Sequence, residues 1–100
     1  MGVRCGVCGQ RWRTVGEASD EGAVPSFWIG QVEVDAPACG RCVAEYLELD
    51  GVGDFCALSS KAEELVRRMG ARGAVALDVV EAARRDARRL NARHVRFRPA

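Results

Sequence analysis

The sequence predicts a small α+β domain in which a hairpin and a short helix precede a C-terminal helical hairpin. Stretches 10–15 and 27–34 are rich in aromatic and β-branched residues, which predicts strands. Stretches 61–69 and 74–92 carry apolar residues at helical spacing, which predicts helices. A chain of 100 residues buries only a modest fraction of its surface on folding, so a bound ion or a cross-link would help to stabilise it.

Four of the five cysteines form two C-x-x-C pairs, Cys5 with Cys8 and Cys39 with Cys42. A two-residue gap lets both sulfurs of a tight turn face one ion, and two such turns complete a closed tetrahedral site. We therefore expect one structural Zn²⁺ per chain, bound by all four thiolates. Disulfides and a redox C-x-x-C are the alternatives. The remaining cysteine, Cys56, is expected to be a small buried residue.

A short amphipathic helix is expected to begin at the second cysteine pair. Val43, Tyr46 and Leu47 recur at i, i+3, i+4 spacing, and the pattern ends at Asp50 and Gly51. The cysteine pair would then lie on the first turn of the helix. Exposed backbone N–H groups and the positive end of the helix dipole favour thiolates there.

The two predicted strands are expected to pair as one hairpin between the cysteine pairs. The segment that joins them, 16–26, is rich in Gly, Ser and acids, which predicts a loop. On the second strand, Trp28 and Val34 should share one face. Trp12, Phe27 and Trp28 either cover the core and the metal site or form an aromatic contact surface, which makes Trp12 and Trp28 candidate partner-binding residues.

The order of a knuckle, a hairpin and a knuckle at a helix N-terminus resembles the treble-clef and zinc-ribbon group of zinc fingers. Residues 4–50 look most like the N-terminal zinc-binding domain of the ClpX unfoldase, in which C-x-x-C-G precedes a hairpin and Cys-x-x-Cys-Val/Ile opens a helix. This resemblance implies a protein–protein adaptor, and a homodimer. The spacing is also similar to rubredoxins, but no Gly follows Cys42 and no Pro follows Cys39, so an iron electron carrier is the lesser hypothesis.

The C-terminal part is expected to be a helical hairpin. Ser60 and Glu63 match a capping box at the start of its first helix, and Gly70 is expected to end that helix. The chain is therefore divided into a four-cysteine zinc-binding module, 1–55, and a helical hairpin with a basic C-terminal helix, 56–100.

Charge is distributed unevenly along the chain. The first 60 residues carry four Arg against nine acids, and the last 40 carry eleven Lys and Arg against five acids. Arginine forks match phosphate geometry, so the basic helix predicts contacts with DNA or RNA. The candidate nucleic-acid-binding residues are Arg84, Arg85, Arg88, Arg89 and Arg93. The alternatives are a solvated or internally paired helix face and an acidic protein partner.

Several function classes are not expected. The single histidine is His94, and the chain has no Gly-rich phosphate loop, no nucleophile with a base and no open metal site, so we expect no enzyme activity. No apolar run approaches the roughly 20 residues of a membrane span. The first residues contain no signal-peptide core, and a cytoplasmic location is expected. The lead hypothesis is a non-enzymatic, nucleic-acid-binding or transcription-associated regulator.

Overall fold

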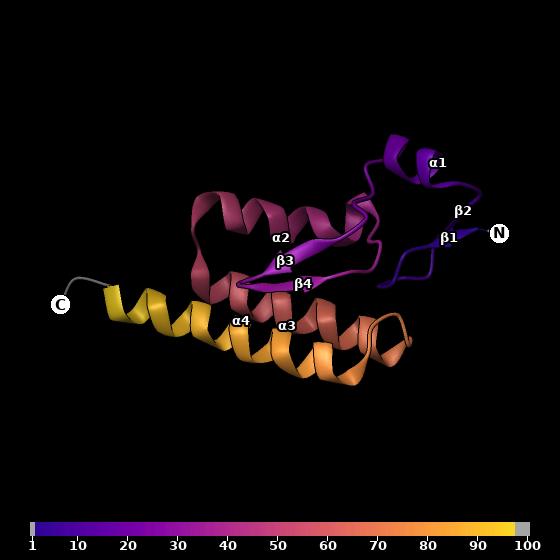
Figure 1. The fold of residues 1–100 in the computed structure, drawn as a ribbon. Coiled ribbons are helices and arrows are strands. Elements are labelled where there is room, and N and C mark those ends of the chain that lie inside the picture. Colours follow the sequence, from indigo (N-terminus) through magenta and orange to yellow (C-terminus); the bar gives the residue numbers. More distant parts are fainter. Residues whose placement is uncertain (1, 98–100) are drawn as a thin grey trace.

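The computed structural model describes the backbone of residues 2–97 and the side chains of residues 2–90. Within this part of the chain, two small antiparallel hairpins and four helices make an α+β fold (Figure 1). The elements are β1 (Val3–Arg4), β2 (Arg11–Trp12), α1 (Val15–Asp20), β3 (Phe27–Ile29), β4 (Val32–Val34), α2 (Gly40–Val52), α3 (Phe55–Ala71) and α4 (Leu77–Phe97). None of the described helices is both long enough and apolar enough to cross a membrane.

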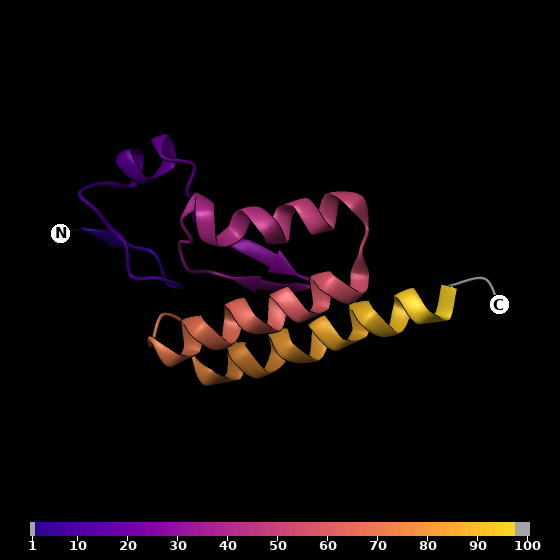
Figure 2. The ribbon, with the colours of Figure 1, turned by 180° about the vertical axis from the view of Figure 1, so that it is seen from behind.

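The β3–β4 hairpin lies between α2 on one side and the α3–α4 pair on the other (Figures 1 and 2). The β1–β2 hairpin and α1 lie at one end of the molecule, beside the turn between α3 and α4. The largest fully buried side chains come from β3, β4, α2, α3 and the turn between β1 and β2: Cys5, Val7, Ile29, Val34, Val43, Leu58, Leu65, Val66 and Met69. One hydrophobic cluster contains residues from both of the predicted segments.

The strand pairing differs from the single hairpin that the sequence predicts. Strand β2 pairs with β1, and the stretch 27–34 is itself a hairpin that turns at Gly30 and Gln31. Gly30 has φ +60°, a left-handed conformation that closes a two-residue turn and that few residues other than glycine adopt. The predicted loop 16–26 is also wrong in part, because it begins within helix α1. Thr14 caps this helix by accepting a hydrogen bond of 3.1 Å from the N–H of Glu17.

The turn at Gly30 also changes which side chains share a face. Phe27 lies opposite Val34 in the β3–β4 ladder, and both are buried. Trp28 lies opposite Glu33 and points outward, with 58% of its surface exposed. The prediction that Trp28 and Val34 share a face is therefore wrong, because the chain reverses between them.

Helix α3 begins earlier and ends later than the sequence predicts. Asp54 is its N-cap and accepts a hydrogen bond of 3.2 Å from the N–H of Ala57. This cap places Ser60 inside the helix, so the predicted capping box does not form. Cys56 follows on the first turn and is exposed, which contradicts the expected burial. At the other end, Gly70 is the next-to-last helical residue and does not end the helix.

Gly70 allows α3 and α4 to approach closely. A Cβ at Gly70 would lie 2.7 Å from Cγ2 of Val80 on α4, whereas a Cβ at Gly51 would meet no atom within 4 Å. Gly51 is likewise the next-to-last residue of its helix, α2. We expect Gly51→Ala to raise the free energy of unfolding by up to about 1 kcal/mol through helix propensity. In Gly70→Ala, overpacking should instead lower the free energy of unfolding by about 1–3 kcal/mol. Chemical denaturation measures both changes. Equal stability of the two variants would contradict this role of Gly70.

A buried carboxylate attaches α4 to the β3–β4 turn. Asp86 Oδ2 accepts a hydrogen bond of 2.8 Å from the N–H of Gln31, and its other oxygen accepts one of 3.2 Å from Arg89 Nη1. The Asp86 side chain is only 13% exposed. This contact joins residues 55 positions apart in the sequence and fixes the position of α4 along the hairpin.

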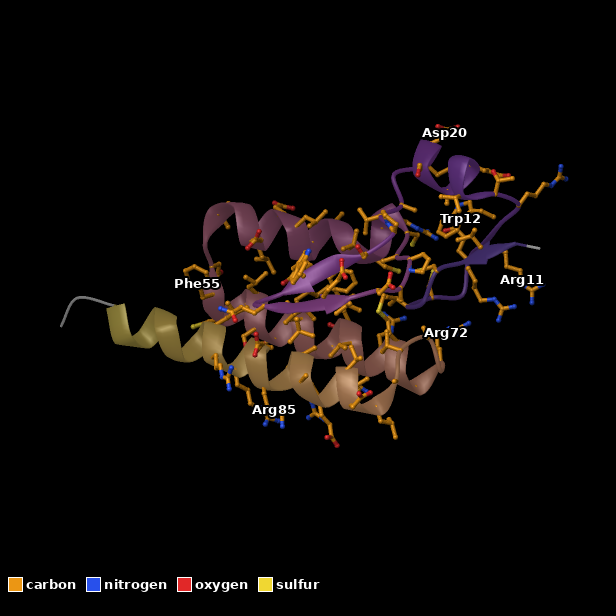
Figure 3. All side chains as sticks on the ribbon, viewed as in Figure 1. Arg11, Trp12, Asp20, Phe55, Arg72 and Arg85 are labelled. Carbon is orange, nitrogen blue, oxygen red and sulfur yellow. The ribbon has the colours of Figure 1, made fainter. Side chains whose placement is uncertain are left out.

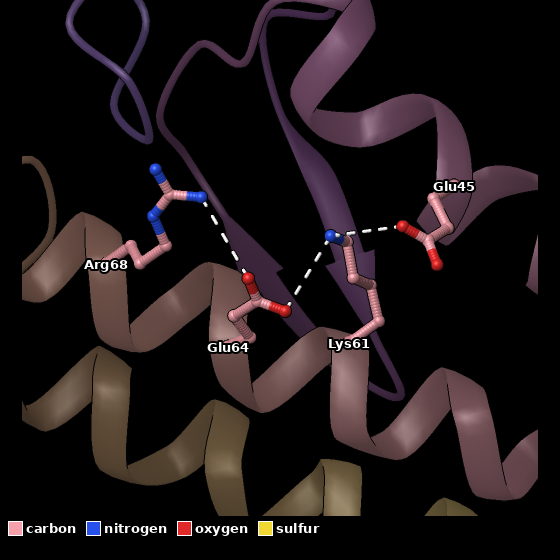
Figure 4. Close-up of polar contacts among 4 residues, drawn as sticks. All are labelled: Glu45, Lys61, Glu64 and Arg68. Carbon is pink, nitrogen blue, oxygen red and sulfur yellow. Dashed lines mark ion pairs between the residues drawn. The ribbon is translucent and has the colours of Figure 1, made fainter.

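Ion pairs connect the outer surfaces of α2 and α3 (Figure 4). Lys61 Nζ lies 3.3 Å from Glu45 on α2 and 3.7 Å from Glu64, which in turn lies 4.0 Å from Arg68. Exposed pairs of this kind contribute about 0.2–1 kcal/mol each. The packing of α2 against α3 therefore depends mainly on the apolar residues beneath them.

Tyr46 fixes α2 to the hairpin. Its hydroxyl donates a hydrogen bond of 2.8 Å to the backbone carbonyl of Trp28, and its ring packs edge-on against Phe27 at 5.8 Å between centroids. Leu47, predicted to share this buried face, is exposed. Burial, with a smaller effect of the Asp50 carboxylate, raises the pKa of Tyr46 from its ordinary value of 10.0 to about 12.

This pKa can be tested directly because the chain has one tyrosine. We expect the tyrosinate absorbance of the folded protein to titrate with a midpoint of about 12, and that of the denatured protein near 10. The fold favours the protonated form of the Tyr46 hydroxyl. The stability that this preference adds to the folded protein is therefore fully present below pH 10 and is lost as the pH rises through about 12. A native midpoint equal to the denatured one would contradict the burial of the hydroxyl.

Candidate metal centre

The first cysteine pair lies in the turn between β1 and β2. The N–H of Cys5 donates to the carbonyl of Gln10 at 2.8 Å, and the N–H of Gly9 donates to the carbonyl of Cys5 at 2.9 Å. Gly9 has φ +83°, so the glycine after Cys8 supplies the left-handed residue that closes the turn. This hydrogen bonding holds Cys5 and Cys8 on one tight knuckle.

The second cysteine pair lies at the start of α2, as the sequence predicts. Cys39 is the N-cap residue, and Cys42 lies in the first turn, with its N–H 3.0 Å from the carbonyl of Cys39. Just before the pair, Ala38 forms an antiparallel bridge with Val24. The bridge positions the helix start, and the N–H of Gly6 donates to the carbonyl of Pro37 at 2.8 Å, which brings the first knuckle alongside it.

The four sulfurs converge on one point. They all lie within 4.8 Å of one another, and those of Cys8 and Cys39 are 3.7 Å apart. In a tetrahedral site with zinc–sulfur bonds of about 2.3 Å, neighbouring sulfurs are roughly 3.8 Å apart. Cys5 and Cys39 are buried, Cys42 is half-buried and Cys8 is exposed. The donor set and its spacing therefore fit one ion with four thiolate ligands.

Backbone N–H groups from both knuckles point at the sulfur of Cys5. The N–H of Val7 lies 3.4 Å from this sulfur and the N–H of Cys39 lies 3.2 Å from it. Burial raises the pKa of Cys5, but hydrogen bonds from the backbone of Cys8, Cys39 and Val7 outweigh it and lower the pKa to about 6. Cys5 is therefore the cysteine best prepared to be a thiolate.

The sulfurs of Cys39 and Cys42 favour the protonated thiol when no ion is bound. Burial raises the pKa of Cys39 despite hydrogen bonds from Cys42 that lower it. Burial also raises the pKa of Cys42, and hydrogen bonds and negative charge from neighbouring cysteines raise it further. Four thiolates so close together repel one another, and a bound divalent cation would reverse this effect and favour the charged form of each.

Comparisons with protein-family models, with curated proteins and with solved structures find no match. The resemblance to treble-clef fingers and to the ClpX domain therefore stays a prediction. The four-cysteine cluster does not depend on it, because the cluster follows from the positions of the sulfur atoms.

The two tryptophans that the sequence singles out lie in different environments. Trp12 is 3% exposed and lies beside α1 at the N-terminal end of the molecule (Figure 3). Trp28 is largely exposed on β3. A substitution of Trp12 would therefore disturb the core first, and only Trp28 presents its ring to solvent.

The arginines of α4 divide into paired and unpaired residues. Arg88 Nε donates to Glu63 Oε1 of α3 at 3.1 Å, and Arg89 pairs with Asp86. Arg85 is exposed and points away from the helix bundle (Figure 3), and Arg84 is half-buried with an Nε that has no partner among the described residues. The side chain of Arg93 lies outside the described residues.

Sequence reasoning missed a second group of arginines. Arg4 and Arg11 lie opposite each other in the β1–β2 ladder, and Arg13 follows β2. The signal was present in the sequence, because the first 13 residues contain these three arginines and no acid.

Proposed function

We propose that this chain is a non-enzymatic zinc protein in which the ion is structural and the surface binds nucleic acid. Cys5, Cys8, Cys39 and Cys42 would hold the ion, which supplies folding free energy and leaves no coordination position for a substrate. The nucleic-acid role is supported by one observation above all. Helix α4 buries Ala83 and leaves Arg85 exposed without an ion pair among the described residues.

Zinc is proposed in preference to iron because of the second knuckle. Tetrahedral thiolates accept either metal. Tuning of an iron centre depends on hydrogen bonds to its sulfurs, and the glycine turn that would supply them after Cys42 is absent. Elemental analysis and a visible spectrum of protein purified without added metal test this assignment. We expect one zinc per chain and no colour, and one iron with a red protein would overturn it.

The arginines of α4 can be tested by salt dependence. We expect the wild-type protein to bind a labelled single-stranded oligonucleotide with an affinity that falls steeply with salt, because bound arginines release counterions from phosphates. Arg84→Gln with Arg85→Gln should reduce the slope of log K against log salt by about 1.4, at roughly 0.7 for each phosphate contact. Fluorescence anisotropy measures this slope.

The matched control is Arg41→Gln. Arg41 is an exposed arginine on α2, and no ion pair of the described residues involves it. It lies between Cys39 and Cys42, so the comparison requires that the variant retain its zinc. This variant should leave the slope unchanged. An affinity that stays flat between low and high salt would contradict nucleic-acid binding. An effect of Arg41→Gln half as large as that of the double variant would show that only net charge matters.

Trp28 supports a protein–protein adaptor as the second candidate function. Its ring is exposed beside Glu33, whereas the other tryptophan is buried. Exposed aromatic rings are common anchors of protein interfaces. If Trp28 mediates a homodimer, light scattering should give a dimer mass for the wild-type protein and a monomer mass for Trp28→Ala with its zinc retained. A wild-type monomer at all concentrations would contradict self-association.

A further inference from the structure

The β1–β2 hairpin holds like charges in direct opposition. Arg4 lies across the ladder from Arg11, and Arg13 follows one residue beyond the end of β2. Like charges directly opposite on neighbouring strands destabilise a hairpin. All three side chains are exposed. The arrangement therefore works against the stability of the free protein and would be relieved by a bound anion.

No ion pair among the described residues neutralises these arginines. The five ion pairs of this part of the chain all involve residues of α2, α3 and α4. Two acids border these arginines: Glu17 of α1 lines the same hollow as all three, and Asp35 lines a second hollow that Arg4 also lines. Two carboxylates against three guanidinium groups leave this surface positive.

The three arginines line a hollow of about 580 Å³ together with Trp12. This volume is within the range of about 300–1,000 Å³ typical of ligand sites. Figure 3 shows Arg11 at this end of the molecule, projecting away from the helix bundle. The hollow can therefore accept a charged group from solvent without a rearrangement of the core.

The thiolates of the metal centre account for only part of this charge. Four thiolates around a divalent ion carry two net negative charges, and a neighbouring cation would offset them. That role fits Arg72, whose guanidinium lies against Gly9 of the first knuckle and which lines a second hollow of about 550 Å³ with Arg4, Cys5 and Asp35. Arg11 and Arg13 do not line this second hollow. The first hollow is lined by none of the cysteines.

We infer that Arg4, Arg11 and Arg13 form a phosphate-binding site for a nucleic-acid strand, separate from α4. The inference takes its ligand class from the proposed function. Guanidinium groups bind phosphate oxygens through paired hydrogen bonds. Arg88 and Arg89 of α4 must give up existing partners to do so, whereas the hairpin arginines have none to lose among the described residues. Arg85 of α4 is likewise unpaired, so the hairpin offers a second set of phosphate contacts beside that of α4.

The test compares two double variants of the full-length, zinc-loaded protein with the same single-stranded oligonucleotide. The hairpin variant combines Arg11→Gln with Arg13→Gln. Arg4 is left unchanged because it directly precedes Cys5, a proposed metal ligand. We expect this variant to keep its zinc and its circular dichroism, and to reduce the salt slope by about 1.4, which is about 25-fold in affinity at roughly 0.1 M salt. Arg41→Gln again serves as the comparison for the loss of one charge, and its zinc content is measured first because Arg41 directly precedes Cys42.

The outcomes separate this inference from the proposed function. A loss of affinity confined to Arg84→Gln with Arg85→Gln would overturn the hairpin site and leave nucleic-acid binding in place. A loss confined to the hairpin variant would support the site and remove α4 from the interface. Absence of binding by the wild-type protein would overturn both. Equal competition by poly-glutamate would overturn phosphate recognition, since carboxylates would then suffice.

Discussion

Replacing Cys5 with alanine is expected to abolish metal binding and to unfold the segment that carries β1, β2 and the start of α2. Cys5 is fully buried and its sulfur accepts hydrogen bonds from both knuckles, so no other side chain can take its place. Zinc binding contributes about 10–16 kcal/mol in zinc-finger peptides. This is comparable with the roughly 5–15 kcal/mol that stabilises a whole domain. Elemental analysis and thermal unfolding followed by circular dichroism measure both effects.

The chain offers a matched control in its fifth cysteine. Cys56 is exposed on α3 and lies outside the four-cysteine cluster. Cys56→Ala should therefore retain one zinc per chain and should melt within a few degrees of the wild-type protein. Treatment of the wild-type protein with a strong chelator should reproduce the effect of Cys5→Ala. A Cys5→Ala protein with a full complement of zinc and unchanged melting would disprove the four-thiolate site.

Gly30→Ala is expected to lower the free energy of unfolding by about 2–5 kcal/mol, because it combines two costs. The first is the left-handed backbone of Gly30, at φ +60°. The second is space, since a Cβ at this position would lie 2.7 Å from Asp86 Oδ2 and would displace the carboxylate from the N–H of Gln31. Chemical denaturation of the zinc-loaded protein measures the loss.

Gly53→Ala separates these two costs. Gly53 ends α2 with φ +72°, and a Cβ there would meet no atom within 4 Å. This variant should lose only the conformational contribution, about 1–2 kcal/mol. Removing the carboxylate in Asp86→Ala should make the further substitution of Gly30 less harmful. If Gly30→Ala and Gly53→Ala cost the same, the contact with Asp86 does not hold α4 in place.

The candidate metal centre could be predicted from sequence because its determinants are local. Each C-x-x-C pair forms within one turn, and the helical spacing of Val43 and Tyr46 places the second pair at a helix start. Only the meeting of the two pairs requires long-range structure. The tetrahedral preference of the ion makes that meeting the simplest interpretation of four paired cysteines.

The errors in the fold came from local signals that compete with one another. Thr14 with Glu17 is a capping box as good as Ser60 with Glu63, yet only the first begins a helix. Asp54 starts α3 earlier, and the helix then passes through Ser60. A glycine such as Gly70 often ends a helix, but here the missing side chain lets α3 pack closely against α4. A tertiary contact decided the case of Gly70, whereas the cap at Asp54 is a local hydrogen bond.

The charge pattern of α4 could be predicted, but its neutralisation could not. Arg88 meets Glu63 across 25 positions of sequence, and Asp86 turns inward to the β3–β4 hairpin. These partners become visible only when α3, α4 and the hairpin are packed together. Part of the arginine surface therefore serves the fold, whichever function the rest serves.

The hydrogen bonds around Cys5 have a kinetic consequence for metal exchange. The N–H of Cys39 donates to the Cys5 sulfur, and the N–H of Gly6 donates to the carbonyl of Pro37, so the two pairs are joined by bonds that do not involve an ion. An arriving ion therefore meets a partly closed cage rather than four separate thiols. Its way in lies on the side of Cys8, the exposed sulfur. An ion that entered or left on that side would leave Cys5 and Cys39 held by the hydrogen bond between them.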